Sequence, residues 1–198
     1  MGASLNTSPY GQVKGEMETG CKTVLSSVSS TIKKGLSLER IVVEHLCKTK
    51  QTLATAESCT GGLLADRITN VEGCSRVFLE GFVLYSDEAK SKRLHLPEST
   101  IQSYGTVSRE VAAEMAERLL CVSGAHYALC TTGTAGPTGG TQQAPVGTAF
   151  ISLASHQASV QIHRGFFPRS REIFKRLAVD AALDMLYCRL LEWLNLKK

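Results

Sequence analysis

Two glycine-rich turns hold most of the side chains that could do chemistry in this chain. The first reads Glu-Ser-Cys-Thr-Gly-Gly at residues 57–62, and the second reads Thr-Gly-Thr-Ala-Gly-Pro-Thr-Gly-Gly-Thr at residues 132–141. Each follows an apolar stretch typical of a strand, and open α/β sheets bind ligands at the carboxyl ends of their strands. Free backbone N–H groups at such turns can hold an anion or stabilise an oxyanion. The residues alone also allow a structural use, in which the hydroxyls cap a tight strand-to-helix connection.

The second turn belongs to a long loop, residues 133–145. Loops of this length in compact domains are usually functional or disordered, which favours a binding role. The loop offers hydroxyls and N–H groups but no carboxylate, and no Gly-Lys-Ser/Thr closes it as in a Walker loop. A dinucleotide fingerprint is also missing.

Several residues compete for the roles of nucleophile and base. Ser58 lies in the first turn, and Lys90 lies on a short predicted helix, where a lysine is usually solvated. Ser86 and Lys90 are one turn apart and could form a dyad, but Ser86 is better explained as the N-cap of that helix. Cys59 is an alternative nucleophile, although no neighbouring feature lowers its pKa, which favours a packed thiol. His95 is a weaker partner for a serine, and the histidines fall in no metal-binding spacing.

The order of apolar patterns predicts the elements that must position these residues. We expect a single-domain α/β fold, a three-layer sandwich in which helices flank a mixed sheet. Ser37 and Ser108 are predicted as helix N-caps. The predicted helices span residues 37–50, 63–69, 87–94, 107–121 and 170–194, and the predicted strands span 52–57, 77–85, 127–132, 146–154 and 159–167, the last two forming a hairpin.

Composition sets the domain limits and excludes some partners. The chain has 198 residues, 43% of them hydrophobic, which suits one domain at 36–198. Residues 1–35 are rich in Ser, Thr, Gly and Lys and are predicted to be a poorly structured or loosely packed extension. Seven cysteines without a CxxC pair indicate a reducing, cytoplasmic setting. A net charge of +4 spread along the chain predicts no nucleic-acid partner, and no apolar run is long enough to predict a membrane segment.

Five motifs together resemble those of one known family. They read AESCTGG at 56–62, YSDEAK at 85–90, GTVS at 105–108, TGTAGP at 132–137 and PVGT at 145–148. An Arg171-Glu172 pair and an Ala- and Leu-rich helix follow. Over roughly residues 37–195 the chain resembles the CinA C-terminal domain family, also described as nicotinamide-nucleotide amidases.

The resemblance implies an activity and a set of site residues. It implies deamidation of nicotinamide mononucleotide, a pyridine nucleotide, to nicotinate mononucleotide and ammonia, with no metal or other cofactor, by a homo-oligomer. The implied catalytic residues are Ser58 as nucleophile and Lys90 as base, with Tyr85 and Thr132 in support. The residues expected to bind substrate or its oxyanion are Glu57, Cys59, Thr60, Gly61, Gly133, Thr134, Ala135, Gly136, Gly140 and Arg171.

The hypothesis has a chemical requirement and two alternatives. Lysine normally titrates near 10.4, so a lysine that acts as base must be shifted downward by burial or a neighbouring cation. Arg171 could bind the substrate phosphate or could equally form a surface ion pair. The alternatives are a non-catalytic module that binds a nucleotide or a protein, for instance in DNA uptake or stress, and an amidase of the same mechanism that acts on another pyridine nucleotide or amide.

Four positions depart from the family's usual residues. Thr134 stands in place of Ile, Thr138 in place of Gly, Ala144 in place of Lys, and Lys175 in place of Arg. The missing loop lysine could weaken phosphate binding or shift substrate preference. It casts less doubt on the chemical step, because Ser58 and Lys90 are intact.

Overall fold

The computed structural model describes residues 37–195 of the chain. Its centre is a mixed sheet in the strand order β2-β1-β3-β4-β5. The strands β1, β2 and β3 run parallel, while β4 and β5 form an antiparallel hairpin at one edge. These strands are β1 (Leu53–Glu57), β2 (Phe78–Val83), β3 (Tyr127–Gly133), β4 (Thr148–Ser155) and β5 (Ala158–Phe166).

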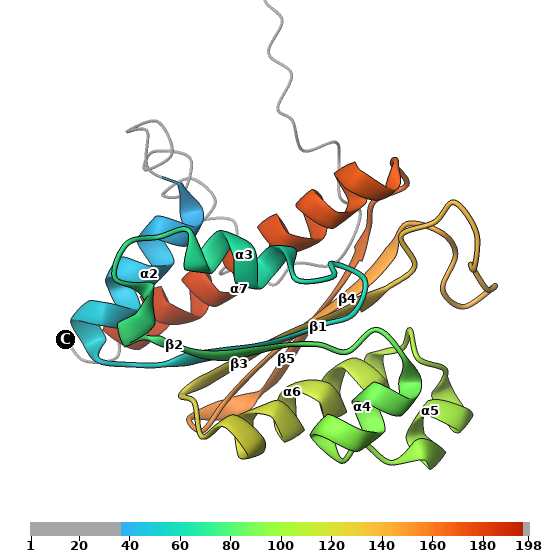
Figure 1. The fold of residues 1–198 in the computed structure, drawn as a ribbon, viewed down its shortest axis with the longest axis horizontal. Coiled ribbons are helices and arrows are strands. Elements are labelled where there is room, and N and C mark those ends of the chain that lie inside the picture. Colours follow the sequence, from blue (N-terminus) through green and yellow to red (C-terminus); the bar gives the residue numbers. More distant parts are fainter. Residues whose placement is uncertain (1–36, 196–198) are drawn as a thin grey trace, which may run out of the picture.

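Helices cover both faces of the sheet, which makes the three layers that the sequence predicts (Figure 1). One layer holds α2 (Leu38–Thr49), α3 (Leu63–Thr69) and α7 (Arg171–Asn195). The opposite layer holds α4 (Asp87–Leu94), α5 (Glu98–Tyr104) and α6 (Arg109–Ser123). A short 3-10 helix, η1 (Cys74–Arg76), leads into β2. Within the described residues, no helix is both long enough and apolar enough to cross a membrane.

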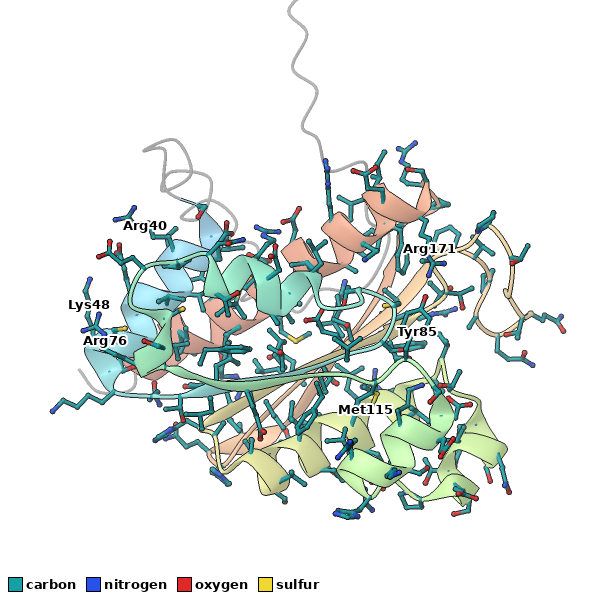
Figure 2. All side chains as sticks on the ribbon, viewed as in Figure 1. Arg40, Lys48, Arg76, Tyr85, Met115 and Arg171 are labelled. Atoms are coloured by element: carbon teal, nitrogen blue, oxygen red, sulfur yellow. The ribbon has the colours of Figure 1, made fainter. Side chains whose placement is uncertain are left out.

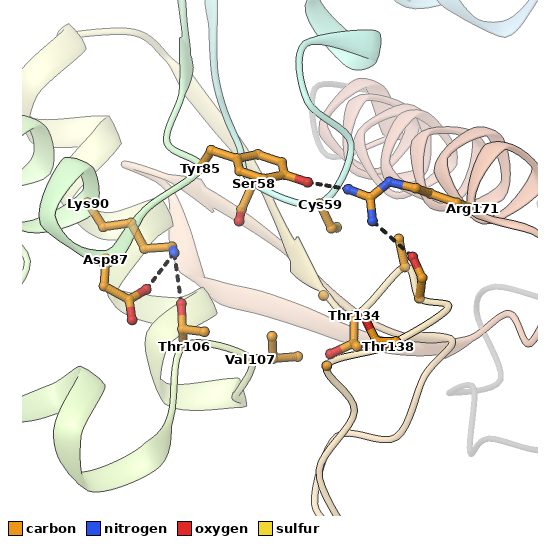
Figure 3. Close-up of a pocket in the computed structure, with 14 residues that line it drawn as sticks. Ser58, Cys59, Tyr85, Asp87, Lys90, Thr106, Val107, Thr134, Thr138 and Arg171 are labelled. Atoms are coloured by element: carbon orange, nitrogen blue, oxygen red, sulfur yellow. Dashed lines mark hydrogen bonds and ion pairs between the residues drawn. The ribbon is translucent and has the colours of Figure 1, made fainter.

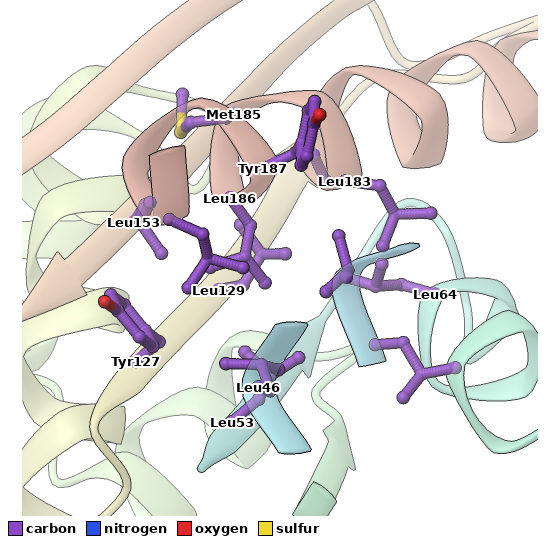
Figure 4. Packing of buried hydrophobic residues seen from close by; sticks show 14 of the residues in the cluster. Leu46, Leu53, Leu64, Tyr127, Leu129, Leu153, Leu183, Met185, Leu186 and Tyr187 are labelled. Atoms are coloured by element: carbon purple, nitrogen blue, oxygen red, sulfur yellow. The ribbon is translucent and has the colours of Figure 1, made fainter. Parts of the chain in front are cut away.

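Buried hydrophobic clusters on both faces of the sheet hold the layers together. On the α7 face, large side chains such as Leu46 of α2, Leu129 of β3 and Leu186 of α7 pack against one another (Figure 4). On the α6 face the sheet presents small residues such as Ala56, against which Met115 of α6 packs. Every residue of β1 is buried because both layers cover it. This central strand therefore gives the first turn a rigid base.

The local signals for helix ends are confirmed in two of three cases. Ser86 accepts a hydrogen bond from the N–H of Ala89, and Ser108 accepts one from the N–H of Val111, so both cap their helices. Ser37 occupies the N-cap position of α2, but its hydroxyl makes no capping hydrogen bond. Helix α5 was not predicted from the sequence. This helix has no buried residue, so it lacks the apolar periodicity on which the prediction relied.

The parallel strands bring three loops to one edge of the sheet. Ser58 directly follows β1, Tyr85 follows β2, and the long loop begins where β3 ends at Gly133. Figure 2 shows Tyr85 close to Arg171 at this edge, whereas Arg40 lies at the far end of the molecule. The carboxyl edge of the parallel strands therefore gathers the predicted site residues, as expected for an open α/β sheet.

Candidate active site

A pocket of about 250 Å³ opens at this edge of the sheet (Figure 3). The turn after β1, the segment after β2, the start of α4, the loop before α6, the loop after β3 and the start of α7 all contribute to it. The lining residues are Ser58, Cys59, Tyr85, Asp87, Lys90, Thr106, Val107, Gly133, Thr134, Ala135, Gly136, Thr138, Gly139 and Arg171. Of the predicted site residues, Glu57, Thr60, Gly61, Thr132 and Gly140 are not among them.

Lys90 is buried rather than solvated, with 1% of its surface exposed. Its Nζ donates hydrogen bonds to Asp87 Oδ1 at 2.9 Å and to Thr106 Oγ1 at 2.7 Å. Partial burial raises the pKa of Asp87, but hydrogen bonds with Thr106 and Lys90 and the charge of Lys90 outweigh it, so this pKa lies below its usual value. The Asp87 carboxylate is therefore ionised at neutral pH. An ammonium group is the form of Lys90 that such a neighbour stabilises.

Ser58 presents its hydroxyl to the same pocket. Its backbone N–H is fixed to the carbonyl of Thr131 in β3, at 2.9 Å. Within the described part of the chain, Ser58 Oγ has no hydrogen-bond partner, so it makes no direct bond to Lys90. Figure 3 shows Ser58 between the group formed by Lys90, Asp87 and Thr106 and the side chain of Cys59. The two predicted catalytic residues thus share one cavity without touching.

Glu57 does not line the pocket, and its carboxylate caps α3. Its carboxylate accepts hydrogen bonds from the N–H groups of Gly62, Leu64 and Ala65 and from the hydroxyl of Thr60, at 2.7–3.0 Å. Gly62 itself adopts a left-handed backbone with φ 94°, a conformation that glycine adopts at little cost. The carboxylate therefore replaces a side-chain N-cap and is fully occupied by the protein. Glu57 and Thr60 hold the turn in place rather than face a ligand.

The first turn offers fewer free N–H groups than its sequence suggests. Besides those bound by Glu57, the N–H of Gly61 donates to Ser58 O and the N–H of Leu63 donates to Thr60 O. In the long loop, by contrast, the N–H groups of Ala135, Gly136, Thr138 and Gly139 have no partner among residues 37–195, and all four residues line the pocket. This loop is the richer source of donors for an anion.

Arg171 joins three parts of the site at the start of α7. Its guanidinium donates to the carbonyl of Gly136 at 2.9 Å and to the hydroxyl of Tyr85 (Figure 3). No carboxylate of the described residues pairs with it. The surface ion pair considered for Arg171 is absent there. Its charge stays available beside the free N–H groups of the loop.

The remaining predicted residues have structural surroundings. Burial raises the pKa of the Cys59 thiol to about 12, and Cys59 packs against Ala135 and Phe174, which fits a packed thiol rather than a nucleophile. Thr132 Oγ1 donates to the carbonyl of Thr106 at 2.9 Å and so fixes the backbone of Thr106, which lines the pocket. His95 is the C-cap of α4 and does not line the pocket. In the part of the chain that is described, no group of three His, Cys, Asp or Glu side chains is arranged to hold a metal ion.

Two residues that contact Lys90, Asp87 and Thr106, were not among the predicted site residues. Asp87 lies three positions before Lys90 on one helix, a spacing at which side chains meet, so the sequence did contain this signal. Thr106 is 16 positions away and follows a different helix. Only the folded chain could bring its hydroxyl to the amine.

A model of the CinA C-terminal domain family matches residues 36–190. The chain belongs to this family. A CinA-like protein of Akkermansia muciniphila is 45% identical over 149 residues, which cover 75% of this chain and 36% of that protein. A CinA-like protein of Chlorobium chlorochromatii is 41% identical over 169 residues, which cover 82% of this chain and 40% of that protein. The match thus spans well under half the length of these relatives.

Solved structures of family members share the fold described above. The competence/damage inducible protein CihA of Agrobacterium tumefaciens superposes with a TM-score of 0.74 at 35% identity, over 76% of this chain and 92% of that one. A CinA superfamily protein of Klebsiella pneumoniae gives a TM-score of 0.75 at 31% identity, over 79% and 97%. The α/β fold with its mixed sheet is therefore that of the CinA family.

Proposed function

We propose that this CinA-family chain is an amidohydrolase that deamidates nicotinamide mononucleotide to nicotinate mononucleotide and ammonia. The observation that carries the proposal is the pocket that Ser58 and the buried Lys90 both line. Burying a lysine amine is costly unless it is paired, and such groups gather at functional sites. A hydroxyl without a partner beside it supplies the nucleophile that hydrolysis of an amide needs.

In the proposed reaction, Ser58 Oγ attacks the carboxamide carbon and its proton passes to the neutral amine of Lys90. The tetrahedral intermediate then collapses, and Lys90 returns the proton to the leaving nitrogen, which departs as ammonia. Water hydrolyses the resulting acyl-enzyme ester with Lys90 again as base, which restores Ser58 and frees the carboxylate product. Because an ammonium cannot accept a proton, the step requires the amine form of Lys90.

Substrate binding is assigned to the opposite side of the pocket. The phosphate of the nucleotide would lie against Arg171 and the unpaired N–H groups of the loop after β3, since guanidinium and backbone N–H groups are good phosphate ligands. Tyr85 would hold Arg171 through its hydroxyl rather than take part in proton transfer. The family's loop lysine is replaced by Ala144, which is buried and has no charge to offer, so Arg171 carries more of the phosphate binding here.

One observation favours the alternative of a non-catalytic nucleotide-binding module. Lys90 is bonded to Asp87 and Thr106 and makes no bond to Ser58. A pocket arranged in this way could bind a pyridine nucleotide without turning it over. The experiment must therefore read binding and turnover separately.

The test is ammonia release from nicotinamide mononucleotide, compared with nicotinamide and glutamine, together with the shift in melting temperature that each compound causes. We expect ammonia from the nucleotide alone, and a fall of at least about 10³-fold for Ser58→Ala. Ser99→Ala, an exposed serine of α5, is the matched control and should keep full activity. A melting shift without ammonia would support the binding module, and activity in Ser58→Ala would exclude the proposed nucleophile.

A further inference from the structure

The amine of Lys90 is held by two side chains from different segments of the chain. It donates to the Asp87 carboxylate at 2.9 Å and to the Thr106 hydroxyl at 2.7 Å. The backbone carbonyl of Thr106 is in turn fixed by Thr132. A lysine ammonium has three donors. Two are used here, and the third has no partner within the described chain, which leaves it for the cavity shared with Ser58.

Asp87 differs from Lys90 in its access to water. The Lys90 side chain is 2% exposed, whereas that of Asp87 is 51% exposed. Asp87 is also the one carboxylate among the lining residues of the described pocket. The buried amine therefore meets a fixed negative charge at the rim of the site.

From these contacts we propose that Asp87 is a positioning residue for Lys90. Asp87 orients the amine of Lys90 toward Ser58, and the charge of Asp87 sets the pH at which Lys90 can accept a proton. The inference rests on the proposed amidase function for its kinetic consequences. It goes beyond that function by giving a role to a residue that touches neither the substrate carbon nor the nucleophile.

The other ionisable groups around the site do not duplicate this role. Arg171 of α7 carries a guanidinium, Tyr85 a phenol and Cys59 a thiol, so none of them offers a carboxylate to the Lys90 amine. Glu88 of α4 and Glu98 of α5 line a separate neighbouring pocket beside Asp87, and no ionisable group of α6 lines either one. Removing the charge of Asp87 therefore removes the main support for the charged form of Lys90.

Two variants separate the charge of Asp87 from its hydrogen bond. Asp87→Asn keeps an oxygen acceptor but has no charge. The kcat of this variant on the alkaline plateau should stay within about threefold of the wild-type value, while the acidic limb of its kcat/KM profile should move to lower pH. Asp87→Ala loses both, and a poorly held amine should lower kcat by about 10- to 100-fold. Glu88→Gln, which removes the same charge one residue along, is the control and should change neither quantity.

A second readout does not depend on turnover. NMR on protein that contains ¹³C- and ¹⁵N-labelled lysine reports the protonation of Lys90 directly. The Lys90 signal is assigned by its loss in Lys90→Met. We expect its titration midpoint to fall in Asp87→Asn and to stay in Glu88→Gln. An unchanged midpoint and an unchanged acidic limb in Asp87→Asn would overturn the inference. A lowered midpoint in a protein that releases no ammonia would sustain the Asp87 contact and reject the amidase function instead.

Discussion

Replacement of Glu57 by alanine tests whether this residue is a structural cap or a substrate ligand. The sequence placed Glu57 among the binding residues, but the structure buries it, with 1% exposed, and bonds it to α3 and Thr60. Glu57→Ala would break four hydrogen bonds and leave the N–H groups of Gly62, Leu64 and Ala65 without an acceptor, while the hydroxyl of Thr60 would keep Thr131 Oγ1 as its partner. We therefore expect a loss of stability rather than a selective loss of binding.

The size of the loss follows from these contacts. A hydrogen bond to a charged group contributes about 1.5–3 kcal/mol, and a buried donor left without a partner costs about 1–3 kcal/mol. The four bonds form one network, so their contributions do not add fully, and water can enter the vacated space. A loss of about 4 kcal/mol in the free energy of unfolding is expected. The total free energy of unfolding of a native domain is only about 5–15 kcal/mol, so the variant should be close to unfolding at 37 °C.

The assay is urea unfolding followed by circular dichroism, with nicotinamide mononucleotide binding measured on the protein that remains folded. Glu72→Ala, an exposed glutamate beyond α3, is the control and should change the free energy of unfolding by less than about 0.5 kcal/mol. If Glu57→Ala unfolded like the wild type yet bound the nucleotide much more weakly, Glu57 would be a substrate ligand rather than a helix cap.

Three further outcomes are expected. Iodoacetamide at neutral pH should alkylate the exposed Cys121 and spare Cys59, because burial raises the pKa of the Cys59 thiol to about 12. Peptide mass spectrometry measures the labelling of each cysteine. Early labelling of Cys59 together with loss of activity would favour Cys59 as the nucleophile. Burial raises the pKa of Asp184, so its ionised form destabilises the folded state. Asp184→Asn should therefore raise the free energy of unfolding at pH 7. This gain should vanish below about pH 4, where the carboxyl group is protonated in both the folded and the unfolded state. Gly133→Ala should lower the free energy of unfolding at pH 7 by about 1–3 kcal/mol, measured by urea titration, because a Cβ at this position would lie 2.6 Å from the backbone oxygen of Thr148. Unchanged stability would show that the backbone of β4 can shift at little cost.

The sequence predicted the elements well wherever the signal was local. Apolar periodicity gave the strands and the longer helices, and serines gave the caps at Ser86 and Ser108. The same local reasoning failed for α5, which has no fully buried residue. It was also incomplete for α3, because the acceptor for its N–H groups is Glu57 at the end of a strand rather than a serine or threonine at the N-cap.

By itself, the sequence determined the family, the fold class and the loops that line the pocket. These depend on residue type and spacing along the chain, which the motifs from residue 56 to residue 148 record directly. Only the tertiary structure decided which side chains face the pocket. It turned Glu57 inward, brought Thr106 to Lys90, and placed Arg171 against Tyr85, 86 positions earlier. Such contacts depend on how separate helices pack on a twisted sheet, and no spacing along the chain encodes that geometry.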